Sequence, residues 1–309
     1  MARYLVRRFI SMILAIWVVA TLTFFIMKAL PGGPFAREKA IPPSILANIE
    51  ASYHLNDPLL KQYADYMVRL VKWDLGPSFK QKGRTVNEII VDHFPVSAQL
   101  GLSAVFLSLL VGIPAGIISA LRQNKWQDQL AMFLSVIGVS VPNFVLASLL
   151  MYVFALKLGW LPAAMWGQLK HMVLPTIALA GFPMAFVARL TRSSMLEVLQ
   201  QDYIRTAKSK GLSQRVVIYR HALKNSLIPV ITYLGPLIAG ILTGSFVVEK
   251  IFAIPGLGRY FVQSINNRDY TVIMGITFFD SLLLVGLNFL VDLAYMLVDP
   301  RIRLMDGRK

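Results

Sequence analysis

Residues 202–211 read DYIRTAKSKG, a polar and basic stretch within a chain that otherwise consists mainly of long apolar runs. The stretch lies in a segment from Ser194 to Lys224, with five Lys or Arg residues between Arg205 and Arg220. Asp202 can cap a helix through its side-chain oxygen, and Gly211 can end that helix in the left-handed conformation. Because a helix of about eight residues is marginally stable alone, it needs a surface to dock on. We expect this surface to belong to a soluble partner at a membrane face.

The composition indicates an integral membrane protein. The 309 residues have a mean hydropathy of +0.60, 56% are hydrophobic and only 15% are charged, and the apolar residues occur in runs close to bilayer length. The absence of Cys excludes disulfides, thiolate metal sites and cysteine nucleophiles. The four His residues, His54, His93, His171 and His221, are far apart and fall on different sides of the predicted membrane, so no metal site is expected.

Six apolar runs are long enough to cross a bilayer. They are Phe9 to Met27, Ser97 to Ala120, Leu130 to Leu156, Met172 to Ala188, Leu227 to Val248 and Thr271 to Val298. In lipid each run must be helical, because only a helix satisfies its own backbone donors and acceptors. The sequence therefore predicts an all-α membrane protein with six transmembrane helices. The first run exceeds the roughly 7 to 15 apolar residues of a signal peptide, so we expect a retained helix rather than a cleaved one.

The positive charges predict the orientation, because Lys and Arg concentrate in cytoplasmic loops. With the N-terminus inside, 17 Lys and Arg residues fall on the cytoplasmic side, against 5 in the two short external loops. Both termini are therefore expected in the cytoplasm, and this topology explains the net charge of +15 without nucleic-acid binding. The predicted parts are a tip with the first helix (1–30), an extracytoplasmic segment (31–96), a core of helices 2–6 (97–298) and a cytoplasmic tail (299–309).

Two external segments carry local signals. After Asp57-Pro58, apolar residues at helical spacing predict an amphipathic helix on the outer face of the spans: Leu59, Tyr63, Tyr66, Met67, Leu70 and Val71. A turn is expected at Asp74 to Pro77. Between the fifth and sixth runs, Pro and Gly forbid a continuous helix, so we expect an external loop or partly re-entrant element. The candidate residues of this loop are Glu249, Pro255, Gly256, Gly258, Arg268 and Asp269.

Six short motifs, each present once, lie along the chain. They are Arg7-Arg8, Pro31 to Pro34, Asp74 to Ser78, Asp202 to Gly211, His221 to Asn225, and Glu249 through Asp269-Tyr270. Each is weak alone, but in this order they are specific. The chain resembles the binding-protein-dependent ABC transporter permeases of the oligopeptide/dipeptide group, and most closely the oligopeptide permease B type. The resemblance implies the permease fold of type I ABC importers in a prokaryotic plasma membrane.

In such permeases a cytoplasmic Glu-Ala-Ala motif, followed by three residues and Gly, forms a coupling helix that sits in a groove of the ATPase. Alignment on Gly211 places Arg205-Thr206-Ala207 at this motif, and only the final Ala matches. The departure is similar to the peptide-permease branch. The resemblance implies that the coupling region is 194–224 and that its ATPase-coupling residues are Asp202, Tyr203, Arg205, Thr206, Ala207, Lys208 and Gly211.

The chain contains no Gly-x-x-x-x-Gly-Lys-Ser/Thr loop, so ATP must be hydrolysed by another chain. The subunit is therefore expected to be no enzyme and to hold no cofactor, with ATP and Mg bound by partner subunits. The resemblance implies two ATP-binding subunits, a second permease that completes a heterodimer, an extracytoplasmic peptide-binding protein and a peptide substrate.

Polar residues and prolines within the runs are candidates for the translocation pathway or a helix interface. Asp280, near the middle of the sixth run, is costly in lipid and should face the bundle interior, a partner helix or water. Asn288 lies roughly on the same side. Pro142, which precedes Asn143, frees backbone groups that can line a gate or kink the packing.

Other functions remain open on the sequence alone. The same architecture can import dipeptides, nickel or a sugar, because no single residue in the sequence identifies a peptide as the substrate. A stand-alone channel or secondary transporter would predict internal repeats or a conducting polar stripe, and the sequence shows neither. A membrane anchor or receptor would keep the docking helix without a pathway.

Overall fold

The computed structural model describes residues 2–31, 33–34, 55–242 and 245–298. His54, the tail 299–309 and part of the predicted external segment lie outside the described residues. The helices are α1 (Ala2–Ala29), α3 (Leu59–Val71), α4 (Val86–Leu121), α5 (Trp126–Ser140), α6 (Asn143–Leu150), the π-helical η1 (Met151–Lys157), α7 (Leu169–Leu199), α8 (Asp202–Ser209), α9 (Gln214–Val216), the π-helical η2 (Val217–Ala222), α10 (Leu223–Ser226), α11 (Ile228–Leu242), α12 (Phe246–Ile251), α13 (Leu257–Asn267) and α14 (Tyr270–Val298).

The predicted all-α class is confirmed. Four helices are long and apolar enough to cross a membrane, within α1, α4, α7 and α14. Two further candidates are bent pairs, Trp126–Ser140 with Asn143–Lys157 and Gln214–Ser226 with Ile228–Leu242. Counting each pair as one span gives up to six spans in the described part of the chain, as the six runs predict.

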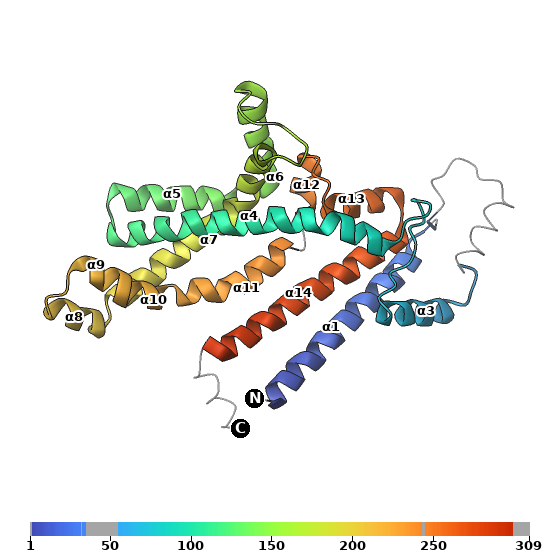
Figure 1. Ribbon diagram of the computed structural model, residues 1–309, viewed down its shortest axis with the longest axis horizontal. Helices are drawn as coiled ribbons and strands as arrows, with labels where there is room; N and C mark the ends of the chain where they lie inside the picture. Colours follow the sequence, from blue (N-terminus) through green and yellow to red (C-terminus); the bar gives the residue numbers. More distant parts are fainter. Residues whose placement is uncertain (1, 32, 35–54, 243–244, 299–309) are drawn as a thin grey trace.

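The third run is not the single helix that its hydropathy predicts. The chain bends by 106° between α5 and α6. Val141, with φ −86° and ψ 118°, is extended, and α6 begins after Pro142. The physical reason is the proline, because its ring disfavours the helical conformation in the residue before it. In Figure 1 α6 consequently rises away from the layer formed by α4, α5 and α7.

The fifth run also ends earlier than predicted. α11 stops at Leu242, and Val248 belongs to the separate helix α12. The segment that follows, for which an external loop or partly re-entrant element is predicted, is interrupted as its Pro and Gly residues predict, but it is largely helical. It forms two short helices, α12 and α13, with a tight turn between them that ends at Gly256.

The centre of the molecule is the pairing of α4 with α7. Small residues let the two backbones approach closely: a Cβ added at Gly116 would lie 2.5 Å from the Ala188 carbonyl oxygen, and one at Gly112 would lie 2.8 Å from that of Met184. Close approach at small residues is the usual way in which helices associate in a bilayer. A buried apolar cluster that includes Leu100, Ala104, Leu174, Ala178, Leu237 and Phe252 joins this pair to α11 and α12.

α1 and α14 lie side by side in Figure 1 and form the second layer, with the rings of Phe9 and Phe289 6.3 Å apart. The first residues of α1 and the last residues of α14 lie toward the same end of the molecule as α8, and α3 and α13 lie at the opposite end. We call these the α8 end and the α13 end.

The amphipathic helix predicted after Pro58 is α3. Tyr63 and Tyr66 pack on the ring of Phe24 in α1, and Leu70 is buried. Val71 is 86% exposed and Leu59 is 46% exposed, so the assignment of these two residues to the packed face is wrong: they are the last and first residues of the helix, and its packed face lies between them. The predicted turn follows, with Gly76 at φ +87°.

Candidate functional site

α8 is the short helix that the sequence places between Asp202 and Gly211. It spans Asp202–Ser209, and Gly211 has φ +75°, the left-handed conformation that the sequence predicts after the helix. The predicted side-chain cap is wrong: the N-cap residue is Gln201, and no side-chain cap bond forms. Asp202 is instead the first helical residue, 98% exposed, and its carboxylate lies 3.6 Å from the Arg205 guanidinium.

One face of α8 packs on the rest of the chain. Ile204 and Ala207 are buried in a cluster with Met195 of α7, Ala120 of α4, and Val217 and Ala222 of η2. Ala207, which the sequence assigned to ATPase coupling, therefore faces inward. The rest of that predicted set lies on the surface: Asp202, Tyr203, Arg205, Thr206, Lys208 and Gly211. α8 thus presents a polar, basic face at one end of the molecule.

The surface of α8 continues into the following segment. The Asn225 side-chain amide donates a hydrogen bond of 2.8 Å to the Tyr203 hydroxyl, which fixes the ring against α10. Arg215, Arg220 and Lys224 are exposed or partly exposed nearby in sequence. The predicted coupling region is therefore one structured surface rather than an isolated helix.

A cavity of about 470 Å³ opens where the α5–α6 bend meets α7 and α11. Pro142 and Asn143, both predicted pathway residues, line it together with Phe182, Pro183, Tyr233 and Pro236. A second cavity of about 600 Å³ adjoins it and shares Val139 and Phe182. The second cavity is lined by Met132, Phe182, Phe186, Arg189, Leu190 and Arg192 among others. Together the two cavities form a recess along α7.

The recess is mainly aromatic and aliphatic. The Phe186 and Tyr233 rings lie 4.3 Å apart between centroids, and Phe182 and Phe186 stack at 6.3 Å. These aromatic residues were not predicted from the sequence. A signal was present, because Phe182-Pro183 and Phe186 fall one turn apart, but hydropathy alone does not separate a recess from a buried core.

Asp280 and Asn288 do not line this recess. Asp280 lies on α14, and its buried Oδ1 atom has no hydrogen-bond partner among the described residues; the Glu249 carboxylate is close enough to interact with it electrostatically. Asn288 is partly exposed farther along α14. The structure therefore separates these two residues from Pro142 and Asn143, with which the sequence grouped them.

Glu249 is fully buried at the α13 end and acts as a helix cap. Its carboxylate accepts hydrogen bonds from the Ser97 hydroxyl at 2.9 Å and from the backbone N–H of Arg259 at 3.1 Å and of Gly258. The acceptor groups therefore satisfy free N–H groups in the first turn of α13. Burial raises the pKa of the Glu249 carboxyl, and these hydrogen bonds offset part of that rise.

The glycines of the same segment make room for this carboxylate. A Cβ at Gly256 would lie 2.4 Å from Glu249 Oε2, and one at Gly258 would lie 3.0 Å from it. The Pro255 carbonyl oxygen lies 2.8 Å from His93 Nδ1 of α4. The segment predicted as an external loop or partly re-entrant element is therefore fixed to α4.

Arg268 and Asp269 connect α13 to α14. Arg268 has φ +55° and donates from Nη1 to the Pro31 carbonyl oxygen at 3.1 Å. Asp269 is buried, accepts from the Ser78 hydroxyl, and accepts from the backbone N–H of Phe79 at 3.1 Å. The predicted Asp74 to Ser78 turn is thereby joined to the first turn of α14. No group of three or more His, Asp or Glu side chains suited to a metal ion is found among the residues that the structure describes.

Comparisons with known proteins agree on one class. A family model described as "Binding-protein-dependent transport system inner membrane component" matches residues 112–304, and a model of the N-terminal part of such components matches residues 1–101. The chain is 56% identical over 304 residues to the dipeptide transport system permease protein DppB of Bacillus subtilis, covering 98% of this chain and 99% of that protein. It is 47% identical over 305 residues to the oligopeptide transport system permease protein OppB of Salmonella typhimurium, covering 98% and 100%.

Two solved structures share the fold. One is a crystal structure of an amino acid ABC transporter with histidines, with a TM-score of 0.55 and 18% identity over 67% of this chain and 92% of that chain. The other is an inward-facing structure of the MetNI methionine ABC transporter, with a TM-score of 0.52 and 15% identity over 68% of this chain and 96% of that chain.

Proposed function

The chain belongs to the family of binding-protein-dependent transport system inner membrane components, and from this premise we propose that it is a membrane-spanning subunit of an ATP-driven peptide importer. Its apolar helices and its family make it a multi-pass protein of a bacterial inner membrane. One observation carries the proposal: the chain matches named peptide permeases over nearly its full length, at 56% and 47% identity.

The proposed partners follow from what this chain offers and what it lacks. It has no phosphate-binding loop for ATP, so two ATP-binding subunits would supply hydrolysis with bound Mg. The exposed face of α8 would dock on one of them, with Arg205 meeting an acidic group or a carbonyl oxygen. An extracytoplasmic binding protein would deliver peptide at the α13 end.

A second permease subunit would complete the pathway. The recess along α7 opens on a face of the subunit where Phe182, which lines it, is 46% exposed. A pathway between two subunits requires such a face, because each subunit then contributes one wall. In this arrangement the recess residues Pro142, Asn143, Phe182 and Tyr233 would line the route of the peptide.

Transport would occur by alternating access. Closure of the ATP-binding subunits displaces α8, and rigid-body rocking of the helices packed on α8 changes which end of the pathway is open. α8 can transmit such a displacement because it packs on η2, and Ile204 and Ala207 are buried in a cluster shared with α7, α4 and η2.

The cargo is proposed to be an oligopeptide, with a dipeptide as the alternative. The relatives named above include both a dipeptide and an oligopeptide permease. A recess lined by aliphatic and aromatic groups can pass side chains of different chemistry, because it offers few fixed hydrogen-bond partners. We therefore expect the binding protein to supply most of the selectivity.

Uptake of labelled solutes tests the proposal. Cells that lack this chain are compared with cells in which it is restored, using a tetra- or pentapeptide, a dipeptide, nickel and a sugar. We expect restoration to return uptake of the longer peptide. Return of the dipeptide alone would favour the alternative cargo, and return of nickel or sugar alone would refute peptide transport. If no solute returned, the importer assignment would fail.

A further inference from the structure

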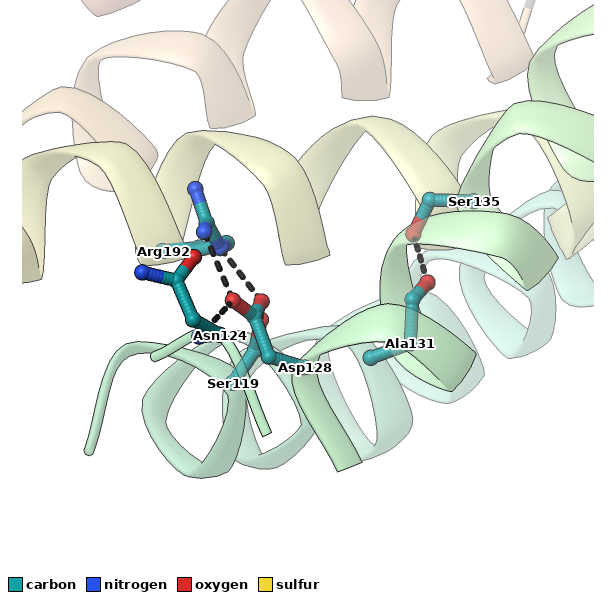
Figure 2. A network of polar contacts seen from close by, with 6 residues as sticks. All are labelled: Ser119, Asn124, Asp128, Ala131, Ser135 and Arg192. Atoms are coloured by element: carbon teal, nitrogen blue, oxygen red, sulfur yellow. Dashed lines mark hydrogen bonds and ion pairs between the residues drawn. The ribbon is translucent and has the colours of Figure 1, made fainter. Parts of the chain in front are cut away.

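An ion pair near the α8 end has no role in the function proposed so far. Arg192 of α7 donates from Nε to Asp128 Oδ1 at 2.6 Å and from Nη2 to Oδ2 at 2.8 Å. Figure 2 shows the planar guanidinium facing the carboxylate in this two-pronged arrangement. Such bidentate pairs fix orientation as well as distance. The pair therefore holds α7 and the first turn of α5 in one relative position.

Asp128 also joins α4 to the pair. The Ser119 hydroxyl of α4 donates to Oδ1, and the backbone N–H of Asn124, in the α4–α5 connection, donates to Oδ2 at 2.9 Å. The Asp128 side chain is 5% exposed, whereas the Arg205–Asp202 pair on α8 lies in solvent. One carboxylate thus receives hydrogen bonds from three elements, α4, the connection and α7.

The residues beside this network share a buried cluster with α8. Ala120 follows Ser119 in α4, Met195 lies one turn after Arg192 in α7, and both are buried in the cluster that holds Ile204 and Ala207 of α8. At the same level α4 and α7 are in close contact, since a Cβ at Gly116 would lie 3.0 Å from the Arg192 backbone nitrogen. A displacement of α8 therefore acts on η2, on which α8 mainly packs, and reaches α4 and α7 through the cluster that they share.

The other side of the network faces the recess. Arg192 lines the cavity of about 600 Å³ with Met132 and Val139 of α5, and Val139 also lines the adjoining cavity with Pro142. α5 leads directly from Asp128 to the bend at Val141 and Pro142. The position of α5 relative to α7 thus sets the position of one wall of the recess.

We propose that the Asp128–Arg192 pair links α4, α5 and α7 rigidly, so that these helices follow α8 as one body and movement of α8 reaches the wall of the recess. We call this pair the joint. Both act here as positioning residues: Asp128 is buried away from the recess, and Arg192, although it lines the recess, is assigned this role through its contact with Asp128. The proposal rests on the function proposed above, since it assigns the step between docking of α8 and opening of the pathway.

The first test measures peptide uptake per ATP hydrolysed in the complete complex, reconstituted with its binding protein. Asp128→Asn removes the charge but keeps an oxygen acceptor, and Arg192→Lys keeps the charge but loses the two-pronged geometry. Since coupling between sites is typically 5- to 150-fold, we expect each variant to lower uptake per ATP by about tenfold while ATP hydrolysis continues. Asp92→Asn is the matched control, because it breaks an ion pair with Arg84 at the α13 end.

A purely structural pair gives a different result. Its loss would reduce the amount of assembled complex, so that uptake and ATP hydrolysis would fall together and their ratio would stay at the wild-type value. That outcome in both Asp128→Asn and Arg192→Lys would overturn the proposal. If the wild-type complex itself showed no ATP-dependent peptide uptake, the proposed function would fail, and the joint would be tested by the distance measurement below.

The second test uses the absence of native Cys and does not depend on transport. Spin labels at Gln129→Cys in α5 and Gln201→Cys at the start of α8, both exposed positions, report the distance across the joint. We expect one unchanged distance in nucleotide-free and ATP-bound wild-type complex, and a broadened distribution in Arg192→Lys. A wild-type distance that differs between the two states would show that these elements do not move as one body, and would refute the proposal.

Discussion

Gly211 ends α8 with φ +75°, a conformation that residues with a Cβ adopt only at a cost. In the part of the chain that the structure describes, no atom lies within 4 Å of a Cβ built at this position, so backbone conformation and not space restricts substitution. A β-branched residue should therefore be tolerated sterically but should shift the end of α8 and the chain that follows it.

Gly211→Val is expected to abolish peptide uptake while leaving membrane insertion intact. The left-handed conformation costs a residue with a Cβ roughly 1–2 kcal/mol, and a β-branched side chain fits it worst. Gly211→Asn is the matched control, because Asn adopts this conformation more readily. Uptake and the amount of chain in membrane fractions are measured for both variants. Normal uptake by Gly211→Val would contradict the assignment of this helix to coupling.

Burial of Glu249 opposes ionisation of its carboxyl, so the stability of the fold should depend on pH. Because the folded-state pKa is raised, the contribution of this carboxyl to the free energy of unfolding is complete below its unfolded pKa of about 4.3 and is lost as pH rises through the folded pKa. Glu249→Gln does not titrate, so its thermal midpoint in detergent should fall less than that of the wild type as pH rises above this value. If the thermal midpoints of Glu249→Gln and the wild type changed equally with pH, the raised pKa of Glu249 would be contradicted.

Removal of the same side chain has a separate consequence. Glu249→Ala leaves the backbone N–H groups of Gly258 and Arg259 and the Ser97 hydroxyl without their acceptor. An unsatisfied buried group costs about 1–3 kcal/mol, so we expect Glu249→Ala to unfold at a lower temperature than Glu249→Gln at every pH. The same melting experiments measure this difference.

At the scale of elements, the packing of α4 on α7 depends on small residues. Gly116→Ala would place a Cβ 2.5 Å from the Ala188 carbonyl oxygen and 2.6 Å from Thr191 Cβ, so the helices must separate. Overpacking of this kind costs about 1–3 kcal/mol. Gly286→Ala in α14 is the matched control, because none of the described residues has an atom within 4 Å of its added Cβ. We expect a lower thermal midpoint only for Gly116→Ala; equal midpoints would contradict the close α4–α7 contact.

The elements also show which features a sequence can predict. α3 and α8 follow from local signals, namely apolar spacing in α3 and the glycine after α8. Pro142 predicts a kink in the third run, but the size of the bend between α5 and α6, 106°, does not follow from the sequence, because hydropathy measures composition along the chain and not direction. The Asp128–Arg192 pair joins residues 64 positions apart, and Glu249 caps a helix through a fold-dependent contact with Ser97. Neither has a local signature.

At the scale of the whole molecule, the arrangement predicts sidedness. The first residues of α1, the α4–α5 connection and the last residues of α14 lie toward the α8 end, and α13 lies at the opposite end. Single cysteines in this cysteine-free chain can report it. We expect a membrane-impermeant maleimide to label Gln263→Cys in α13 from outside, and Gln123→Cys in the α4–α5 connection only after the membrane is opened. The reverse pattern would contradict the orientation predicted from the positive charges.

The burial of Ile204 and Ala207 has a consequence for assembly. α8 is folded on its own subunit before any partner arrives, so docking does not require the chain to become ordered. Binding then loses less conformational entropy than the folding of a free peptide on the same surface would. A synthetic peptide spanning 200–212 should therefore compete poorly with the intact subunit for an ATP-binding partner, even though it carries every exposed side chain of the helix.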